Sequence, residues 1–254
     1  MQRAFAEPPG LVRQVANAVE GIPIDFAGGC SVAKGTLLAL LAHDRGLPSI
    51  DIGVYRGRSL LPQAVAQARL GGMAVGIDPY DREEARQVDR PDMLDALEAW
   101  RRTCDPEGLY REVLERIRRL GLQGSCRLVR LPSRHAGPHI HDLGRCGLVH
   151  IDGNHDEVNV RTDIALACPR IAAGGWLVMD DPSWPSVGRA MAAIPHDFVP
   201  VHREQAAEDY AVFWRRGPLR STARARAYCA WAASASKRAC TDPGSSAGPT
   251  DASR

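Results

Sequence analysis

The segment SIDIGVYRGRS, residues 49–59, decides the fold of this chain. Four residues with the character of a buried strand lead into a turn that contains Gly53 and Gly57, and helical character begins near Arg58. In an open α/β sheet, ligands bind at the carboxyl ends of the strands, and such a turn is the usual cradle. The two glycines let the backbone come close to a ligand. The segment therefore predicts the first strand and the binding turn of an α/β sheet.

Outward from this segment, short apolar runs alternate with amphipathic stretches. We expect strands at residues 49–54, 73–78, 126–131, 147–152 and 176–180, and helices at residues 58–69, 94–100, 107–120 and 157–168. Continuous apolar strands that are separated by helices favour a parallel sheet covered on both faces. The glycines at positions 174 and 175 are expected to stop the preceding element just before the strand at 176–180.

Two further strands, residues 198–201 and 210–214, are expected to end the sheet. The polar residues 203–209 between them are enough for a hairpin but too few for a helical crossover. The sheet is therefore predicted to be mostly parallel, with an antiparallel pair at its end.

The composition changes before and after the sheet. Residues 1–47 are predicted to form a helical N-terminal segment, with a break at Gly28 and Gly29 and with Ser31 as the N-cap of the following helix. Residues 218–254 are rich in Ala, Ser, Arg, Gly and Pro, and we predict a largely disordered tail there. The main domain then occupies residues 48–217.

Length and composition narrow the class of protein. The chain has 254 residues, 44% of them apolar, and a net charge of +2, so it can bury one sizeable core and shows no sign of a nucleic-acid partner. We find no apolar run that approaches the ~20 residues of a membrane span and no secretion signal. The seven cysteines are scattered and form no C-x-x-C pair. A reduced, cytoplasmic protein without a membrane or nucleic-acid partner is the simplest interpretation, and a homo-oligomer stays open.

Three classes of cofactor compete for the first turn. A phosphate-binding P-loop is absent, and Tyr55 lies where a dinucleotide turn needs its second glycine. The acid Asp51 before the turn and the Gly53–Gly57 spacing suit a ligand with a cationic amine and no phosphate, such as S-adenosylmethionine (SAM). Asp78, at the tip of the second strand, is placed to accept both ribose hydroxyls. The alternative for Asp78 is a turn cap before a proline.

Aspartates end two strands that are expected to be neighbours. Asp152 follows the strand at 147–152, and Asp180 and Asp181 end the strand at 176–180. Neighbouring strand tips lie ~5 Å apart, so three carboxylates would repel one another unless they are protonated or bind a cation. Oxygen ligands favour a hard divalent ion, and we predict Mg²⁺ or another divalent cation here. Because side chains alternate along a strand, the chain must bend at 180–182 for all three to serve; otherwise one acid merely caps the next segment.

Histidines accompany these acids. His155 lies three residues after Asp152, and we predict that it is the general base that removes the proton of a hydroxyl group as a methyl group is transferred. It is alternatively a substrate-orienting or surface residue. His150, inside the strand, is interpreted as a core histidine whose hydrogen bonds are satisfied.

The strings DIGVYRGRSLL, VGIDPY, LVHIDGNH and GGWLVMDD, taken in this order, resemble the class I SAM-dependent methyltransferases. They look most like the metal-dependent branch with macrocin-type sugar O-methyltransferases of antibiotic pathways. The resemblance covers residues 49–214 and implies a Rossmann-like, seven-stranded sheet with an antiparallel last strand and helices on both faces. Residues 80–110 form a long charged stretch that the resemblance does not align, and the tail has no counterpart in this family.

The resemblance also implies the site residues. It places SAM in the domain at 48–217, on the strand tips and turns. It also implies that the N-terminal segment folds over the cofactor. The implied contacts are Asp51, Gly53, Tyr55, Gly57, Ser59 and Asp78 for SAM, with Gly29, Cys30 and Ser31 from the N-terminal segment, and Asp152, Asp180 and Asp181 for Mg²⁺, with His155 as base. Ser133, at the end of the third strand, is a further candidate near the adenine ring.

The predicted function is a SAM-dependent, Mg²⁺-dependent O-methyltransferase that acts on a hydroxyl of a small molecule. The low aromatic content of 6% favours a sugar moiety of a natural product over a flat aromatic acceptor. The alternatives are a metal-independent methyltransferase directed to nitrogen or a carboxyl group, and a SAM-binding module without catalysis. Tyr55 disfavours an NAD-dependent oxidoreductase.

Overall fold

A seven-stranded sheet forms the centre of the protein. The structure, a computed structural model, describes residues 6–25, 29–206, 208–218 and 221–239. The strand order is β3-β2-β1-β4-β5-β7-β6. Strands β1 to β5 are parallel, and β7 runs antiparallel to both β5 and β6. The bounds are β1 Ser49–Ile52, β2 Ala74–Ile77, β3 Cys126–Val129, β4 Cys146–Ile151, β5 Ile171–Asp180, β6 Phe198–Glu204 and β7 Tyr210–Arg215.

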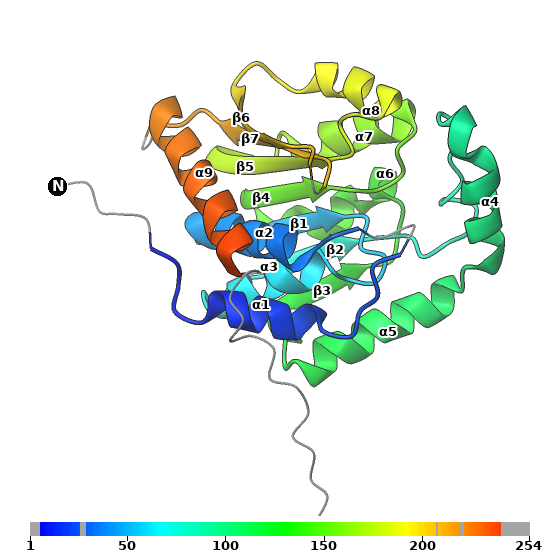
Figure 1. Ribbon diagram of the computed structural model, residues 1–254, viewed down its shortest axis with the longest axis horizontal. Helices are drawn as coiled ribbons and strands as arrows, with labels where there is room; N and C mark the ends of the chain where they lie inside the picture. Colours follow the sequence, from blue (N-terminus) through cyan, green and yellow to red (C-terminus); the bar gives the residue numbers. More distant parts are fainter. Residues whose placement is uncertain (1–5, 26–28, 207, 219–220, 240–254) are drawn as a thin grey trace, which may run out of the picture.

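Helices cover both faces of the sheet (Figure 1). One apolar core lies between the sheet and α1 (Leu11–Val19), α2 (Val32–Asp44), α3 (Leu60–Ala68), α5 (Pro106–Arg119) and α9 (Thr222–Ala239). A second core lies between the opposite face and α6 (Ser133–Ala136), α7 (Glu157–Ala167) and α8 (Pro185–Ala190). The predicted Rossmann-like fold, with its antiparallel last strand, is confirmed.

The strand β5 is longer than predicted. It begins at Ile171 rather than at 176, so Gly174 and Gly175 lie inside the strand instead of before it. The pairing of β4 with β5 shifts register between Cys146 and Leu148, opposite this glycine pair, and Gly174 has a φ of 83°. A glycine in a strand often marks such a bulge. The prediction of a stop at the glycines was wrong for this reason.

The predicted disordered tail is also wrong over much of its length. Residues 222–239 form α9, which packs against α2 through a buried row of small and aromatic side chains: Ala225, Tyr228, Cys229, Ala232, Ala233 and Ala235. Alanine has the highest helix propensity and lets a helix approach its neighbour closely. The composition that suggested disorder is therefore that of a packed helix. Residues 240–254 of the predicted tail lie outside the described residues.

The N-terminal segment is tied to the turn after β1. Ser31 caps α2 as predicted, because its side chain accepts a hydrogen bond from the Lys34 backbone N–H. Arg58 of the turn is buried and donates to the carbonyl oxygens of Cys30 (2.5 Å), Val19 (3.3 Å) and Ile22. Gly28 of the predicted break lies outside the described residues. The segment between α1 and α2 is thus fastened beside the binding turn.

Residues 81–105 form an excursion between β2 and α5. It contains a short 3₁₀ turn, Pro91–Met93, and α4 (Leu94–Thr103), which has no fully buried residue. Figure 1 shows α4 at the edge of the molecule, away from the sheet. Nowhere in the described ranges does a helix combine the length and apolarity that a membrane span requires.

We predict that Tyr228→Ala lowers the free energy of unfolding by about 3–5 kcal/mol. The Tyr228 ring is buried and stacks on Trp176 with ring centroids 5.7 Å apart, and its hydroxyl donates to the Leu40 carbonyl at 3.0 Å. Chemical denaturation gives the value. The exposed neighbour Arg226→Ala is the control and is expected to change stability by less than about 0.5 kcal/mol. Equal, small effects of both variants would mean that α9 does not pack on the sheet domain.

Candidate active site

A cavity of about 510 Å³ opens at the carboxyl edge of the sheet. Its lining comes from the tips of β1, β2, β4 and β5, from the N-terminal segment, and from the excursion at residues 81–105. Nine of the predicted site residues line this cavity: Gly29, Gly53, Tyr55, Asp78, Ser133, Asp152, His155, Asp180 and Asp181. The position agrees with the rule that open α/β sheets bind ligands at this edge.

The turn after β1 is held in its conformation by Asp78, which directly follows β2. The Asp78 carboxylate accepts hydrogen bonds from the backbone N–H groups of Val54 and Tyr55, both at 2.9 Å, and from that of Tyr80 at 2.8 Å. Burial raises the pKa of Asp78, and the three backbone donors oppose this shift. Tyr55 and Tyr80 both adopt left-handed backbone conformations, with φ of 49° and 46°. Such strained positions in non-glycine residues cluster at functional sites.

Gly53 is required by the protein backbone itself. It has a φ of 88°, and a Cβ atom there would lie 1.9 Å from the carbonyl oxygen of Asp152. The tips of β1 and β4 therefore approach too closely for any side chain at this position. Gly57, with a φ of 84°, does not line the cavity and serves the turn conformation.

Three other predicted residues do not line the cavity: Ser31, Asp51 and Ser59. Asp51 is fully buried and accepts hydrogen bonds from Ser59 Oγ (2.7 Å) and Gln63 Nε2 (3.0 Å), so Asp51 and Ser59 bind each other beneath the turn. Ser31 donates through its backbone N–H (2.9 Å) and its hydroxyl (2.5 Å) to Glu208. The polar groups of these residues are used inside the protein, which the pattern of residue types could not reveal.

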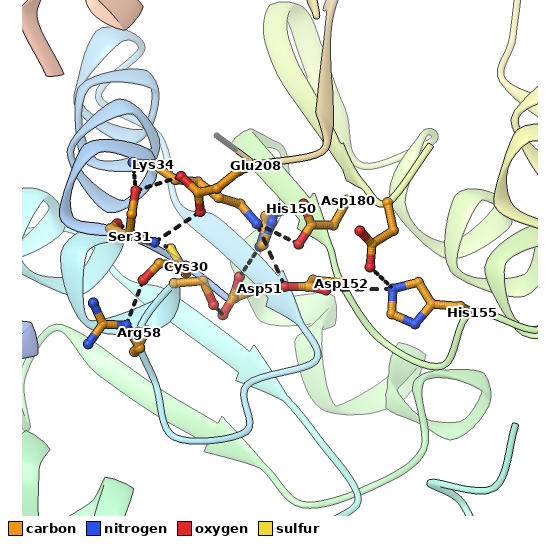
Figure 2. A network of polar contacts seen from close by, with 12 residues as sticks. Cys30, Ser31, Lys34, Asp51, Arg58, His150, Asp152, His155, Asp180 and Glu208 are labelled. Carbon is orange, nitrogen blue, oxygen red and sulfur yellow. Dashed lines mark hydrogen bonds and ion pairs between the residues drawn. The ribbon is translucent and has the colours of Figure 1, made fainter. Parts of the chain in front are cut away.

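Asp152, Asp180 and Asp181, here called the acidic centre, follow the paired ends of β4 and β5. Ile151 lies opposite Met179, which brings the Asp152 and Asp180 carboxyl groups together. Lys34 reaches them from α2: its Nζ lies 2.5 Å from Asp180 Oδ2 and 3.9 Å from Asp152 Oδ2 (Figure 2). Sequence reasoning did not identify Lys34, which is one of only two lysines in the chain.

The charges in the acidic centre affect one another. Burial and the neighbouring Asp180 raise the pKa of Asp152 well above its usual value. Burial opposes ionisation of Asp180, but the Lys34 ammonium, a hydrogen bond with Asp152 and the charge of His150 together outweigh burial and lower the pKa of Asp180 to about 2. Without a further cation, the pair therefore favours one ionised and one protonated carboxyl group.

His150 connects the acidic centre to Asp51. Its Nδ1 lies 2.7 Å from Asp51 Oδ1, whereas its Nε2 has no hydrogen-bond partner among the described residues, although the ring is fully buried. Ligand atoms of His150, Asp152 and Asp180 all lie within 4.8 Å of one another. The interpretation of His150 as a satisfied core histidine was therefore wrong for one of its two nitrogens.

Asp181 and His155 form the outer part of the site. Asp181 has a φ of 47°, so the chain bends directly after β5, as the alternation of side chains requires. Its Oδ2 lies 3.2 Å from His155 Nε2, which is also 3.8 Å from Asp152 Oδ1. The His155 ring packs on Trp184, with centroids 4.6 Å apart. His155 thus faces Asp152, Asp181 and the cavity.

Further cavity residues were missed because they come from helices and loops without a motif. Asp163 of α7 is 2% exposed, and burial raises its pKa to about 7, while a hydrogen bond with Ser133 opposes the shift. Met93, Leu97 and Trp100 line the cavity from the excursion. The ring of Trp100 lies 6.0 Å from that of Tyr55 in an edge-on arrangement. The excursion at residues 81–105 therefore forms one wall of the cavity.

Comparison with known proteins agrees with this geometry. A family model described as a methyltransferase domain matches residues 50–182. No curated protein matches the sequence closely enough to count as a relative.

Solved structures share the fold at low identity. The O-methyltransferase NovP is 14% identical, with a TM-score of 0.61 over 82% of this chain and 97% of NovP. The O-methyltransferase TomG from Streptomyces achromogenes, involved in tomaymycin synthesis and solved with SAM, is 15% identical, with a TM-score of 0.54 over 83% and 92%. An O-methyltransferase from Bacillus cereus in complex with SAH is 14% identical, with a TM-score of 0.55 over 83% and 92%. At these identities the similarity concerns the fold alone.

We predict that Gly53→Ala destabilises the protein by several kcal/mol more than Gly71→Ala. Both glycines have a positive φ, 88° and 64°, so both variants carry backbone strain. Only at Gly53 does the new methyl group also meet the Asp152 backbone, whereas nothing lies within 4 Å at Gly71. Urea denaturation of both variants separates the two contributions, and equal losses would contradict the close approach of β1 and β4.

We predict that Asp163→Asn makes the protein more stable than the wild type at pH 8 but not at pH 4. The folded protein holds the Asp163 proton up to about pH 7, whereas the unfolded chain releases it near pH 4. The stabilisation that the protonated Asp163 gives the wild-type protein is therefore fully present below pH 4. It is lost as the pH rises to 7, by up to about 4 kcal/mol. Thermal melts across this range measure the difference between the two proteins. A difference that does not depend on pH would refute the raised pKa.

Proposed function

Because the methyltransferase-domain model covers more than half of the chain, the protein belongs to that family, and we propose that it transfers a methyl group from SAM to a hydroxyl oxygen of a small molecule. The single observation that carries this proposal is that one cavity joins Asp78 at the tip of β2 to the acidic centre and His155 at the tips of β4 and β5. A nucleoside and a hydroxylated acceptor can therefore lie side by side on the same sheet edge.

Asp78 and the glycine turn are proposed to bind SAM. The Asp78 carboxylate lines the cavity and is fixed by three backbone donors, which preorganises it to accept the ribose hydroxyls. Ser133 and Asp163 lie near each other on the same side and supply acceptors for the adenine amino group. Gly53 and Tyr55 are proposed to contact the amino-acid end of SAM. The solved structures of TomG and of the Bacillus cereus enzyme with SAM or SAH support this choice of ligand.

His155 is proposed to accept the proton of the acceptor hydroxyl. Its Nε2 faces Asp152 and Asp181 across 3.8 and 3.2 Å, and its ring packs at a tilt against that of Trp184, which restrains its orientation. As the acceptor oxygen takes the methyl group, its proton passes to His155, and the products are a methyl ether and S-adenosylhomocysteine. Positioning and electrostatic stabilisation supply most of the rate.

We further propose a divalent cation, most simply Mg²⁺, at the acidic centre. The residues fit such an ion, because ligand atoms of His150, Asp152 and Asp180 lie within 4.8 Å of one another, the buried Nε2 of His150 has no hydrogen-bond partner among the described residues, and Asp181 lies close by on the side of His155. Oxygen ligands suit Mg²⁺, and an imidazole nitrogen among them also suits Mn²⁺. When bound, the ion lowers the pKa of a coordinated hydroxyl.

We propose a sugar moiety of a natural product as the acceptor, in the cytoplasm. The cavity offers carboxylates for hydroxyl groups on one side and the apolar side chains of Met93, Leu97 and Trp100 on the other, which suits a ring with polar edges and an apolar face. The involvement of TomG in tomaymycin synthesis supports a natural-product role. The six cysteines of the described residues are free, as in a reducing compartment.

Incubation with SAM, Mg²⁺ and a panel of sugars, polyols and catechols is expected to release S-adenosylhomocysteine, and calorimetry is expected to show binding of SAM but not of NAD.

His155→Gln is expected to lower kcat by about 10²–10⁴-fold with unchanged SAM affinity, while the exposed control His139→Gln keeps full activity. Chelation with EDTA is expected to stop turnover. Turnover that persists in EDTA would favour a metal-independent methyltransferase, and SAM binding without any product would favour a binding module.

A further inference from the structure

We infer that Lys34 is a fixed positive charge of the acidic centre, which holds the inner oxygens of Asp152 and Asp180 and makes the centre selective for a cation of charge +2. The inference rests on the divalent cation in the proposed function and assigns a role to a residue outside the predicted ligand set. Lys34 acts through the two carboxylates, so it is a positioning residue.

The contacts of Lys34 divide the carboxylate oxygens into two sets. The ammonium group is 2% exposed and contacts Oδ2 of Asp180 and Oδ2 of Asp152. On the other side, Asp152 Oδ1 and Asp181 Oδ2 face His155. Figure 2 shows Lys34 and His155 on opposite sides of Asp152 and Asp180. Asp152 Oδ1 and Asp181 Oδ2 therefore remain for a second cation.

A buried nitrogen also points to a second cation in this centre. The Nε2 atom of His150 has no hydrogen-bond partner in the described ranges, and the residue is 0% exposed. An imidazole whose Nδ1 is bound by a carboxylate, here Asp51 at 2.7 Å, is oriented as metal-ligating histidines are. Lys34 alone leaves this nitrogen unsatisfied.

The backbone keeps Lys34 in place. The Lys34 N–H donates to the N-cap Ser31, and Ser31 is itself bound twice by Glu208 from the β6–β7 hairpin. At the next position, a Cβ atom on Gly35 would lie 2.9 Å from Pro62 of α3, so α2 packs closely on α3 here. Movement of the ammonium away from the acids would therefore need a large rearrangement of its own side chain or of the segment.

The charge balance then sets the valence of the ion. A metal binds carboxylates in their ionised form. The three carboxylates of the acidic centre and the Lys34 ammonium leave two negative charges, which one divalent cation neutralises. The Asp51 carboxylate lies outside this count, because it is bound by Ser59, Gln63 and His150 beneath the turn. The chain contains 30 arginines and two lysines. A compact ammonium can bind one oxygen of each acid, whereas the guanidinium fork favours both oxygens of one carboxylate.

The test compares the affinities of Mn²⁺ and Tb³⁺ for the full-length protein by calorimetry and terbium luminescence. Lys34→Met is expected to shift the affinity ratio at least tenfold towards Tb³⁺, because three negative charges then remain. Asp181→Asn removes one negative charge and is expected to shift the ratio in the opposite direction. Lys237→Met is the control: this lysine, the other one in the chain, pairs with Glu204 at 2.5 Å outside the cavity, and its loss should leave the ratio unchanged.

An unchanged ratio in folded Lys34→Met protein would overturn the inference. If that variant does not fold, Asp181→Asn still decides, because an unchanged ratio there would also show that the charge count is wrong. A wild-type protein that binds neither ion would overturn both this inference and the divalent cation. Release of S-adenosylhomocysteine, measured on the same preparation, would show that methyl transfer itself still stands.

Discussion

The contact of Lys34 with Asp180 and Asp152 is the interaction on which the rest of the site depends. The parallel register of β4 and β5 places Ile151 opposite Met179, so the acids that follow cannot avoid each other. Their repulsion has to be offset from outside the sheet, and a helix of the N-terminal segment supplies the ammonium group. The anchors of that segment, Arg58 on Cys30 and Glu208 on Ser31, therefore stabilise the acidic centre although neither touches it.

A second layer of polar contacts lies beneath this pair and joins the two ends of the cavity. Asp51 on β1 binds Ser59 at the start of α3 and His150 on β4. Its neighbour in the turn, Gly53, allows the backbones of β1 and β4 to meet. A shift of the turn would therefore also move the imidazole that faces the acids. The proposed SAM end and the acidic centre are parts of one rigid arrangement of strand tips.

Much of this architecture could be predicted because it follows from local pattern. The strand ends located Asp78, Asp152 and Asp180 correctly, since a strand that is buried on both faces has a clear end in the sequence. The direction in which Asp51 points, and the partner of Asp180, could not be predicted. The first depends on which face of the sheet a residue occupies, and the second, Lys34, is 146 positions away. The helix α9 was missed because its alanines resemble low-complexity sequence until a partner surface is known.

In the proposed function, the excursion at residues 81–105 links acceptor binding to the chemistry. Its backbone N–H groups at Val88 and Asp89 donate to the buried Asp156 carboxylate at 2.8 Å, and Asn154 donates to the carbonyl oxygens of Glu84 and Arg86. Asn154 and Asp156 flank His155. The hydrogen bonds that hold the wall with Met93, Leu97 and Trp100 are therefore made by the loop that carries the proposed base. In the proposed function, an acceptor that contacts this wall is also positioned against His155, and the excursion selects the acceptor without moving the acids.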